Sequence, residues 1–276
     1  AVPQLIHILK SDELSGQRWN AAVNLVVALG NAQQLKSLLD VAADESDAAQ
    51  RHALLRALVA VSQQRKLIPA GELESVDRLL SDNQPVSIRA AAAEAVGVWN
   101  IERHGATLQS LAKSEATPLL LRTAAIGGLA SLNNFAGAEL LKGFVSATSE
   151  PYEVREAAVL GIAGRDPDEG ARLAVHLLNT SRGSNPTRLI QTLVQNPKAP
   201  AALIAALEGK TLPEDAAKLA LRAIDSSGRK LDALKLAVSG AGSITSGARK
   251  LSADEMAAFV TDVRTKGDPA RGEAVY

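Results

Sequence analysis

The chain alternates apolar and polar residues with a helical period along most of its length. In the segment 87–99, apolar side chains recur at three- and four-residue steps, which predicts one buried stripe on an α-helix. They are Ile88, Ala91, Ala92, Ala95, Val96 and Trp99. A second set of helices, marked by paired leucines, is expected between helices like the one at 87–99. The pairs are Leu38-Leu39, Leu79-Leu80, Leu140-Leu141 and Leu177-Leu178, and Leu108 and Leu111 hold the equivalent place in one further helix. The pattern predicts a succession of helical hairpins.

Six arginines give these hairpins a repeat. Successive members are separated by 33, 38, 33, 33 and 33 residues: Arg18, Arg51, Arg89, Arg122, Arg155 and Arg188. Three of them open the same local sequence, Arg-x-Ala-Ala, followed by a large aliphatic residue at the seventh position. A period near 33 residues, sustained over most of a chain, is typical of repeat proteins whose units stack on their neighbours.

Prolines at the same interval locate helix starts. Pro85, Pro118 and Pro151 each precede a repeat arginine by four residues. Proline suits the beginning of a helix because the N–H that it lacks would have no partner there. Acidic residues lie just upstream, at Asp82, Glu115 and Glu150, and we expect them to cap these helices or to interact with their dipoles.

The repeat length, proline placement and arginines resemble HEAT repeats over residues 3–228. The signatures of ankyrin and tetratricopeptide repeats are missing. The resemblance implies an all-α fold: a right-handed α-solenoid of about seven HEAT-like helical hairpins over residues 1–239, with a C-terminal helical tail. In HEAT repeats the recurrent arginine commonly contacts acidic groups of adjacent repeats. We carry that ladder over to Arg51, Arg89, Arg122 and Arg155, and interpret all six arginines as structural.

The repeat weakens after Arg188, where Lys218 takes the arginine's place and 229–238 predicts a short helix. Residues 240–250 are expected to form a Gly/Ser linker, flexible by composition. Ser252 and Glu255 then form a capping box that opens a helix to about Lys266, with one apolar face. That face carries Met256, Phe259, Val260 and Val263.

The end of the chain, Gly267-Asp-Pro-Ala-Arg-Gly-Glu-Ala-Val-Tyr276, resembles the first helix of class I cytochromes c. Residues 251–276 are accordingly expected to hold a helix and the start of a truncated cytochrome c-like domain. Together, the two parts resemble multidomain membrane-bound dehydrogenases and haem-binding proteins of the Verrucomicrobium type. In these a HEAT region joins a dehydrogenase-like domain to a c-type cytochrome domain.

This second resemblance implies haem c downstream of Tyr276 and a periplasmic or otherwise exported protein, a location that the residues alone do not give. The chain has no cysteine, so no haem role falls on any residue in it. The expected partners are the neighbouring domains of the same polypeptide or another protein.

The residues suggest no catalytic, cofactor-binding or metal site, and we expect no enzyme activity in this segment. The four histidines, His7, His52, His104 and His176, lack the spacing of helical metal ligands. Lys+Arg and Asp+Glu are both 30, so the net charge of zero does not favour nucleic acid. Trp19 and Trp99 lie at stripe positions, which favours core packing over base stacking. No apolar run suits membrane insertion.

We therefore expect a non-catalytic scaffold or interaction region. The alternative is a free-standing HEAT module that binds a protein or peptide, and a lyase or DNA glycosylase of HEAT type ranks third. The basic residues Arg264, Lys266 and Arg271 are interpreted as a solvated helix end rather than as a surface for an acidic redox partner.

Overall fold

The computed structural model describes residues 2–11, 14–133, 137–181, 183–244, 252–268 and 271. These residues form sixteen α-helices, one short 3-10 helix and no strand, which confirms the all-α class. The chain divides into two compact units, residues 1–173 and 174–276. The division falls inside a helix.

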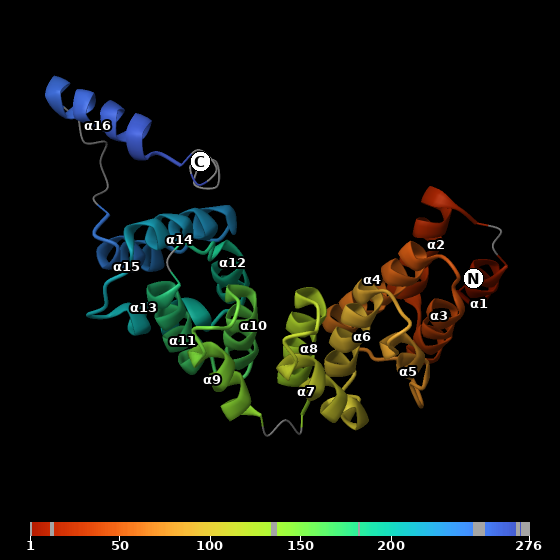
Figure 1. Cartoon of the computed structure of the whole chain (residues 1–276). Helices are drawn as coiled ribbons and strands as arrows, with labels where there is room; N and C mark the ends of the chain where they lie inside the picture. The colour runs from red at the N-terminus through yellow and green to blue at the C-terminus, as the bar shows by residue number, and fades with distance from the viewer. Residues whose placement is uncertain are drawn as a thin grey trace. The chain divides into compact units, whose positions relative to one another are not determined.

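Eleven α-helices and one 3-10 helix begin in the first unit (Figure 1). They are α1 (Val2–Lys10), α2 (Gly16–Leu29), α3 (Ala32–Asp44), α4 (Ala48–Arg65), α5 (Ser75–Leu80), α6 (Val86–Val98), η1 (Glu102–His104), α7 (Gly105–Lys113), α8 (Leu119–Ser131), α9 (Ala138–Ser146), α10 (Tyr152–Ala163) and α11 (Pro167–Thr180), the last of which contains the boundary. The second unit continues with α12 (Thr187–Gln195), α13 (Ala199–Leu207), α14 (Glu214–Ser226), α15 (Asp232–Ala241) and α16 (Ala253–Lys266).

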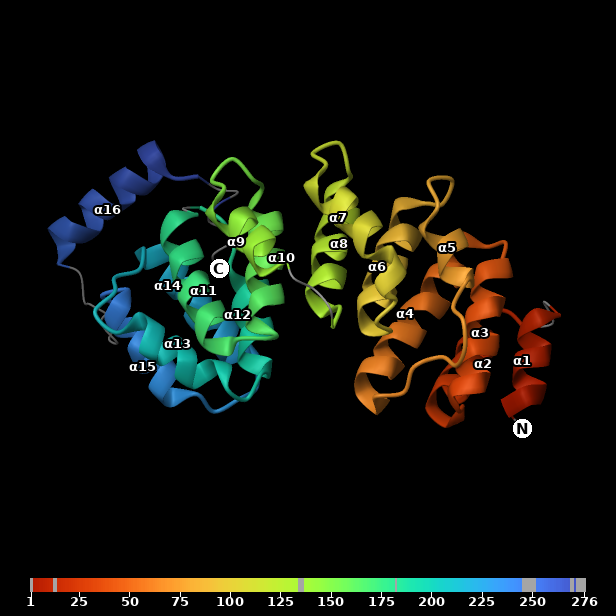
Figure 2. The ribbon, with the colours of Figure 1, turned by 90° about the horizontal axis from the view of Figure 1, so that it is seen from below.

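Within the first unit, consecutive helices pair and the pairs pack on their neighbours. The even-numbered helices α2, α4, α6, α8 and α10 contact one another in order, and α1, α3 and α5 form a parallel row (Figure 2). The two rows are joined by the pairs α1–α2, α3–α4, α5–α6, α7–α8 and α9–α10. In the second unit α12 packs on α14, and α13 packs on α15. The paired leucines of the sequence lie in α3, α5, α9 and α11, as predicted.

The three predicted helix starts are confirmed. Helices α6, α8 and α10 begin directly after Pro85, Pro118 and Pro151, each of which is the N-cap residue. None of these helices has a side-chain hydrogen bond at its N-cap, so Asp82, Glu115 and Glu150 do not cap them; their expected interaction with the helix dipoles stays a prediction. Two of these acids, Asp82 and Glu150, face arginines instead.

Helix α6 is buried on more sides than its single predicted stripe required. Besides Ile88, Val96 and the other stripe positions, Ala90, Ala93 and Gly97 are buried. The reason is that α6 contacts α4, α5 and α8. Its run of alanines leaves room for neighbours on three sides.

Glycines set the distance between α6 and α8. A Cβ atom on Gly97 would lie 2.5 Å from the Gly128 carbonyl oxygen, and one on Gly128 would collide with the Ala93 carbonyl oxygen. Gly127, the next residue along the chain, has no such neighbour within 4 Å. The two backbones therefore touch directly at Gly97 and Gly128.

The C-terminal region follows the sequence only in part. Helix α15 continues through Ala241, so the first two residues of the expected linker are helical. Residues 245–251 lie outside the described part of the chain. Beyond them the capping box of Ser252 and Glu255 is confirmed, with both of its hydrogen bonds present, and α16 ends at Lys266 with Gly267 as its C-cap.

We predict that Gly128→Ala lowers the free energy of unfolding by about 1–3 kcal/mol, because the added methyl group forces α6 and α8 apart. Gly127→Ala is the matched control. It should be neutral or stabilising by up to about 1 kcal/mol, since alanine is the better helix former and the site has space. Urea unfolding followed by circular dichroism measures both. Equal losses in the two variants would contradict direct backbone contact at Gly128.

Candidate functional site

Four repeat arginines cap the helices that precede them. Each donates its Nε–H to a main-chain carbonyl at the C-terminal end of the preceding helix. The pairs are Arg51 with Glu45 (2.9 Å), Arg89 with Leu80 (3.2 Å), Arg122 with Ala112 (2.7 Å) and Arg155 with Val145 (3.0 Å). The last carbonyls of an α-helix have no partner within the helix, and cations are favourable at this negative end of the dipole.

The terminal nitrogens of these arginines find different partners. Arg122 is buried and forms a two-pronged ion pair with Glu150, at 2.7 and 2.6 Å, while its guanidinium lies 5.7 Å from the centre of the Phe144 ring. Glu150 immediately precedes the proline that starts the next hairpin's α10. This is the geometry implied for a ladder, in which an arginine contacts an acid of the adjacent hairpin.

Arg51 and Arg89 have different partners from Arg122. Arg51 reaches the equivalent residue of the next hairpin, Gln84, but that residue is a neutral amide 2.5 Å away. Arg89 pairs with Asp82, at 2.5 Å, which belongs to the loop just before its own helix. The expected acidic contact from an adjacent hairpin is therefore wrong for Arg51 and Arg89.

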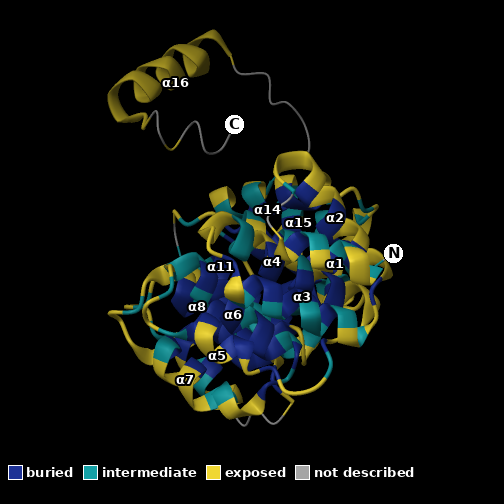
Figure 3. Ribbon diagram, turned by 90° about the vertical axis from the view of Figure 1, so that its right-hand side faces the viewer, coloured by how far each residue is buried: buried dark blue, intermediate teal, exposed yellow. Residues whose placement is uncertain are grey.

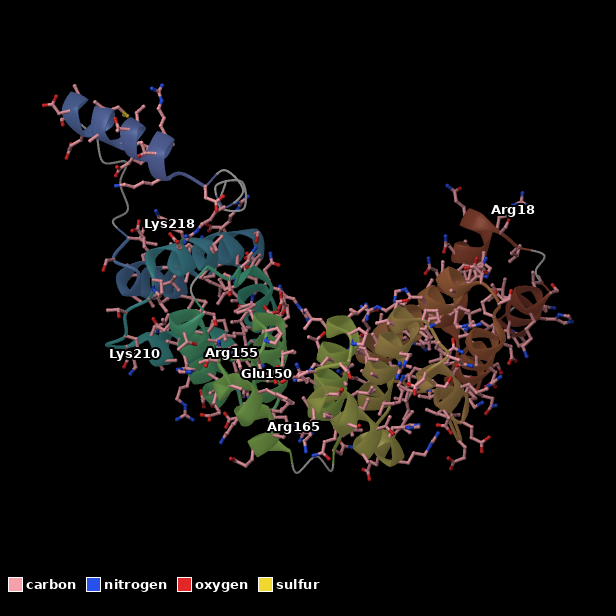
Figure 4. All side chains as sticks on the ribbon, viewed as in Figure 1. Arg18, Glu150, Arg155, Arg165, Lys210 and Lys218 are labelled. Atoms are coloured by element: carbon pink, nitrogen blue, oxygen red, sulfur yellow. The ribbon has the colours of Figure 1, made fainter. Side chains whose placement is uncertain are left out.

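The outermost repeat arginines are placed differently. Arg18, on α2 (Figure 4), is exposed, and so is Arg188, on α12. The sequence interval alone does not distinguish these two exposed arginines from the four that cap a helix, because the exposure of each side chain depends on the helices packed around it.

A second set of arginines, which the sequence analysis missed, reaches back by one hairpin. Arg65, at the end of α4, donates to the Val27 carbonyl near the end of α2, at 2.7 Å. Arg165, after α10, donates to Ala130 (2.6 Å) and Leu132 at the end of α8. Arg229, after α14, contacts the Val194 carbonyl of α12. Their position at the ends of helices could have indicated this role. These three arginines are not evenly spaced in the sequence, however, so no repeat pattern marks them.

The row that contains α3 and α5 is joined by side-chain contacts of its own. Ser75 donates to Asp40 (2.6 Å) and Arg78 to Asp44 (2.8 Å). Farther along, Asp77 of α5 accepts from Arg103 of η1 (3.0 Å) and lies 2.5 Å from the Nε2 atom of His104. Partial burial works to raise the pKa of Asp77, but the hydrogen bonds and charges of Arg103 and His104 outweigh it and leave the pKa lowered.

Among the described residues, the aromatic and histidine side chains do not gather into a site. Trp19 and Trp99 are 5% and 3% exposed, so both pack in the core as predicted and neither can stack on a base. The Trp99 indole donates to the Ser62 hydroxyl at 2.9 Å. Among the described residues, no group of three or more His, Asp or Glu side chains is placed to hold a metal ion.

Two recesses hold polar side chains. One, of about 380 Å³, lies beside α1 and is lined by His7, Lys10 and Ser37. The other, of about 590 Å³, lies in the second unit between the α11–α12 loop and the start of α14. Across the part of the chain that the structure describes, no helix has the length and apolar character needed to span a bilayer.

Helix α16 carries the clearest candidate for an interaction surface. Every described residue from Ser252 to Asp268 is exposed (Figure 3). Its apolar stripe is accordingly open to solvent: Met256 is 49% exposed, Phe259 57%, Val260 40% and Val263 53%. Four large apolar residues on one face of a capped helix are typical of a surface that another structure covers.

Comparison with protein-family models, with curated protein sequences and with solved structures found no match for this chain.

We predict that Arg122→Ala lowers the free energy of unfolding by about 3–5 kcal/mol, because it leaves the Glu150 carboxylate and the Ala112 carbonyl without their partner. Arg18→Ala, at the equivalent repeat position, is the control and should change stability by no more than about 0.5 kcal/mol. Chemical unfolding measures both. Equal effects at the two positions would contradict the role assigned to the buried ion pair.

The lowered pKa of Asp77 predicts a defined pH dependence. A carboxylate whose pKa is lower in the folded state stabilises the fold above its unfolded pKa of about 3.9, and that stabilisation is lost as the pH falls through the folded pKa. Asp77→Asn should therefore destabilise the protein at pH 7 and differ little from the unaltered protein in strong acid. A constant difference in unfolding free energy across this range would contradict it.

Proposed function

We propose that this chain is a non-catalytic scaffold: a right-handed α-solenoid of about seven HEAT-like hairpins within a larger electron-transfer protein. It links a dehydrogenase-like domain to a c-type cytochrome domain. The observation that carries the proposal is α16, a capped helix that follows the stacked hairpins and presents an uncovered apolar face.

The packing of the hairpins supports a scaffold. Polar side chains that could take part in chemistry are engaged between helices, as in Arg122–Glu150 and Asp77–Arg103. Such contacts between neighbours fix the separation and orientation of successive hairpins. A stack held in this way suits the spacing of attached domains.

The face of α16 supports a covering domain. Burying a Met, Phe or Val side chain fully is worth about 1.5–3 kcal/mol, so a surface that covers this stripe would be held firmly. We assign that surface to the cytochrome domain that is expected to follow. The arrangement leaves α16 as the structural bridge between that domain and the second unit.

The residues after α16 support the same assignment. The Asp268 carboxylate accepts a hydrogen bond from the backbone N–H of Arg271 at 3.2 Å, as an N-cap residue does for the third residue of a helix. In the cytochromes that this segment resembles, a helix begins at the equivalent Gly-Asp. Haem c would be held beyond Tyr276, in a periplasmic or otherwise exported protein, because this chain has no cysteine to bind it covalently.

A second candidate is a free-standing module that binds a protein or peptide. Leu25 and Leu29 favour it, since they lie one turn apart on α2 and are 47% and 66% exposed. An apolar pair on one helix face is a small anchor for a partner's side chains. This function needs no cytochrome domain.

The test is the absorption spectrum of the native polypeptide that contains this sequence, extended about a hundred residues past Tyr276 and produced with c-type haem maturation. We expect sharp α and β bands on reduction. A colourless product, or an extension without Cys-x-x-Cys-His, would overturn the electron-transfer context and favour the second candidate.

Two controls complete this test. The 276-residue chain alone, made in the same host, should be colourless because it has no cysteine. In the extended protein, Phe259→Ser should increase amide hydrogen exchange in α16, whereas Ala258→Ser, on the other side of the helix, should not. Equal exchange in the two variants would contradict a covering domain on the apolar face.

A further inference from the structure

The recess in the second unit has a mixed, partly acidic lining. Its volume is about 590 Å³, and its walls come from the loop between α11 and α12 and from the first turn of α14. The polar lining includes Ser184, Asn185, Glu214, Asp215 and Arg271. Four of these belong to the packed body of the unit, whereas Arg271 comes from the segment after α16.

Arg271 enters this lining through an ion pair. Its guanidinium contacts the Asp215 carboxylate, although the two residues are 56 positions apart in the sequence. Both side chains are about half exposed, at 58% and 55%. The backbone N–H of Arg271 donates a hydrogen bond to the Asp268 carboxylate.

The Arg271–Asp215 ion pair connects the tail, which here means α16 and the described residues after it, to the packed helices of the second unit. All described residues of 252–268, including α16, are exposed. The Arg271–Asp215 contact therefore joins the segment after α16 to the start of α14.

The chemistry of the recess suits a guanidinium. Glu214 and Asp215 stand in the first turn of α14, where the helix dipole favours ionised carboxylates. Lys218 hydrogen-bonds Glu214 at 2.7 Å and lowers its pKa, which leaves Asp215 as the carboxylate that faces the arginine. A planar guanidinium matches a carboxylate better than an ammonium group does.

We propose that the Asp215 carboxylate in the wall of this recess is a docking site for Arg271, so that the tail, which carries α16 and Arg271, is latched reversibly onto the rest of the second unit. An exposed ion pair shifts an equilibrium by no more than about fivefold, and salt screens it. The latch therefore exchanges between docked and released states, and ionic strength sets the balance. It acts whether or not a haem domain follows, so it stands apart from the proposed function.

Pulsed electron spin resonance on the 276-residue chain tests the latch. Because the chain has no cysteine, two spin labels can be placed selectively at Ala258→Cys in α16 and Leu236→Cys in α15, both at exposed residues. At about 0.01 M salt, where charges act over about 30 Å, we expect a distinct docked population of distances. Salt at about 1 M should reduce that population about fivefold or less, toward the released distribution.

Variants separate the ion pair from a general charge effect. Arg271→Ala should give the released distribution at both salt concentrations, as should Asp215→Arg. The double variant Asp215→Arg with Arg271→Asp should restore the docked population. Arg264→Ala is the matched control, because it removes the same charge from an exposed residue of α16 and should leave the docked population unchanged.

Three results would overturn the latch. One is a distance distribution that Arg271→Ala does not alter, and another is an equal loss in Arg264→Ala. The third is a docked population that grows with protein concentration, because the arginine would then bind a second copy of the chain. A colourless extended protein would leave all of these measurements unaffected, so this test and that of the cytochrome junction fail independently.

Discussion

The unpaired carbonyl groups at helix ends are the constraint around which this fold is built. Its helices are short, so a large share of their backbone lies within the first or last turn, where hydrogen bonds within the helix are missing. Stacking buries many of these ends, and buried carbonyls need donors. Arginine side chains supply them twice over: one set caps the partner helix within a hairpin, and the other reaches back to the hairpin before. The same contacts that satisfy the backbone therefore also join the stack.

The parts of the fold that depend on local chemistry could be predicted from the sequence. Proline at a helix start and the Ser252–Glu255 capping box act within three or four residues, and both were found where expected. Contacts across hairpins were harder. Arg65 and Arg165 bond to carbonyls 38 and 35 residues away, at no shared interval. The division after Leu173 could not be foreseen either, because no change in composition marks it.

The candidate surface on α16 illustrates a second limit of the sequence. The spacing of Met256, Phe259 and Val263 predicts an apolar face, but the same spacing occurs in helices that are fully packed. Whether the face is covered depends on what stands opposite to it, which periodicity does not encode. The basic residues near the end of the chain show the same limit. Their sequence indicates a solvated helix end, but it does not show that Arg271 contacts the Asp215 carboxylate.

The pairing of Arg51 and Arg122 with the residue just before the helix-start proline of the next hairpin has a consequence for the order of the hairpins. Arg51 meets the amide of Gln84, whereas Arg122 meets the carboxylate of Glu150. These two junctions therefore differ in charge. If one hairpin were deleted or exchanged, a buried guanidinium would face a partner of the wrong charge or none. The Arg51 and Arg122 contacts thus distinguish one helix junction from another, which favours a single order of packing.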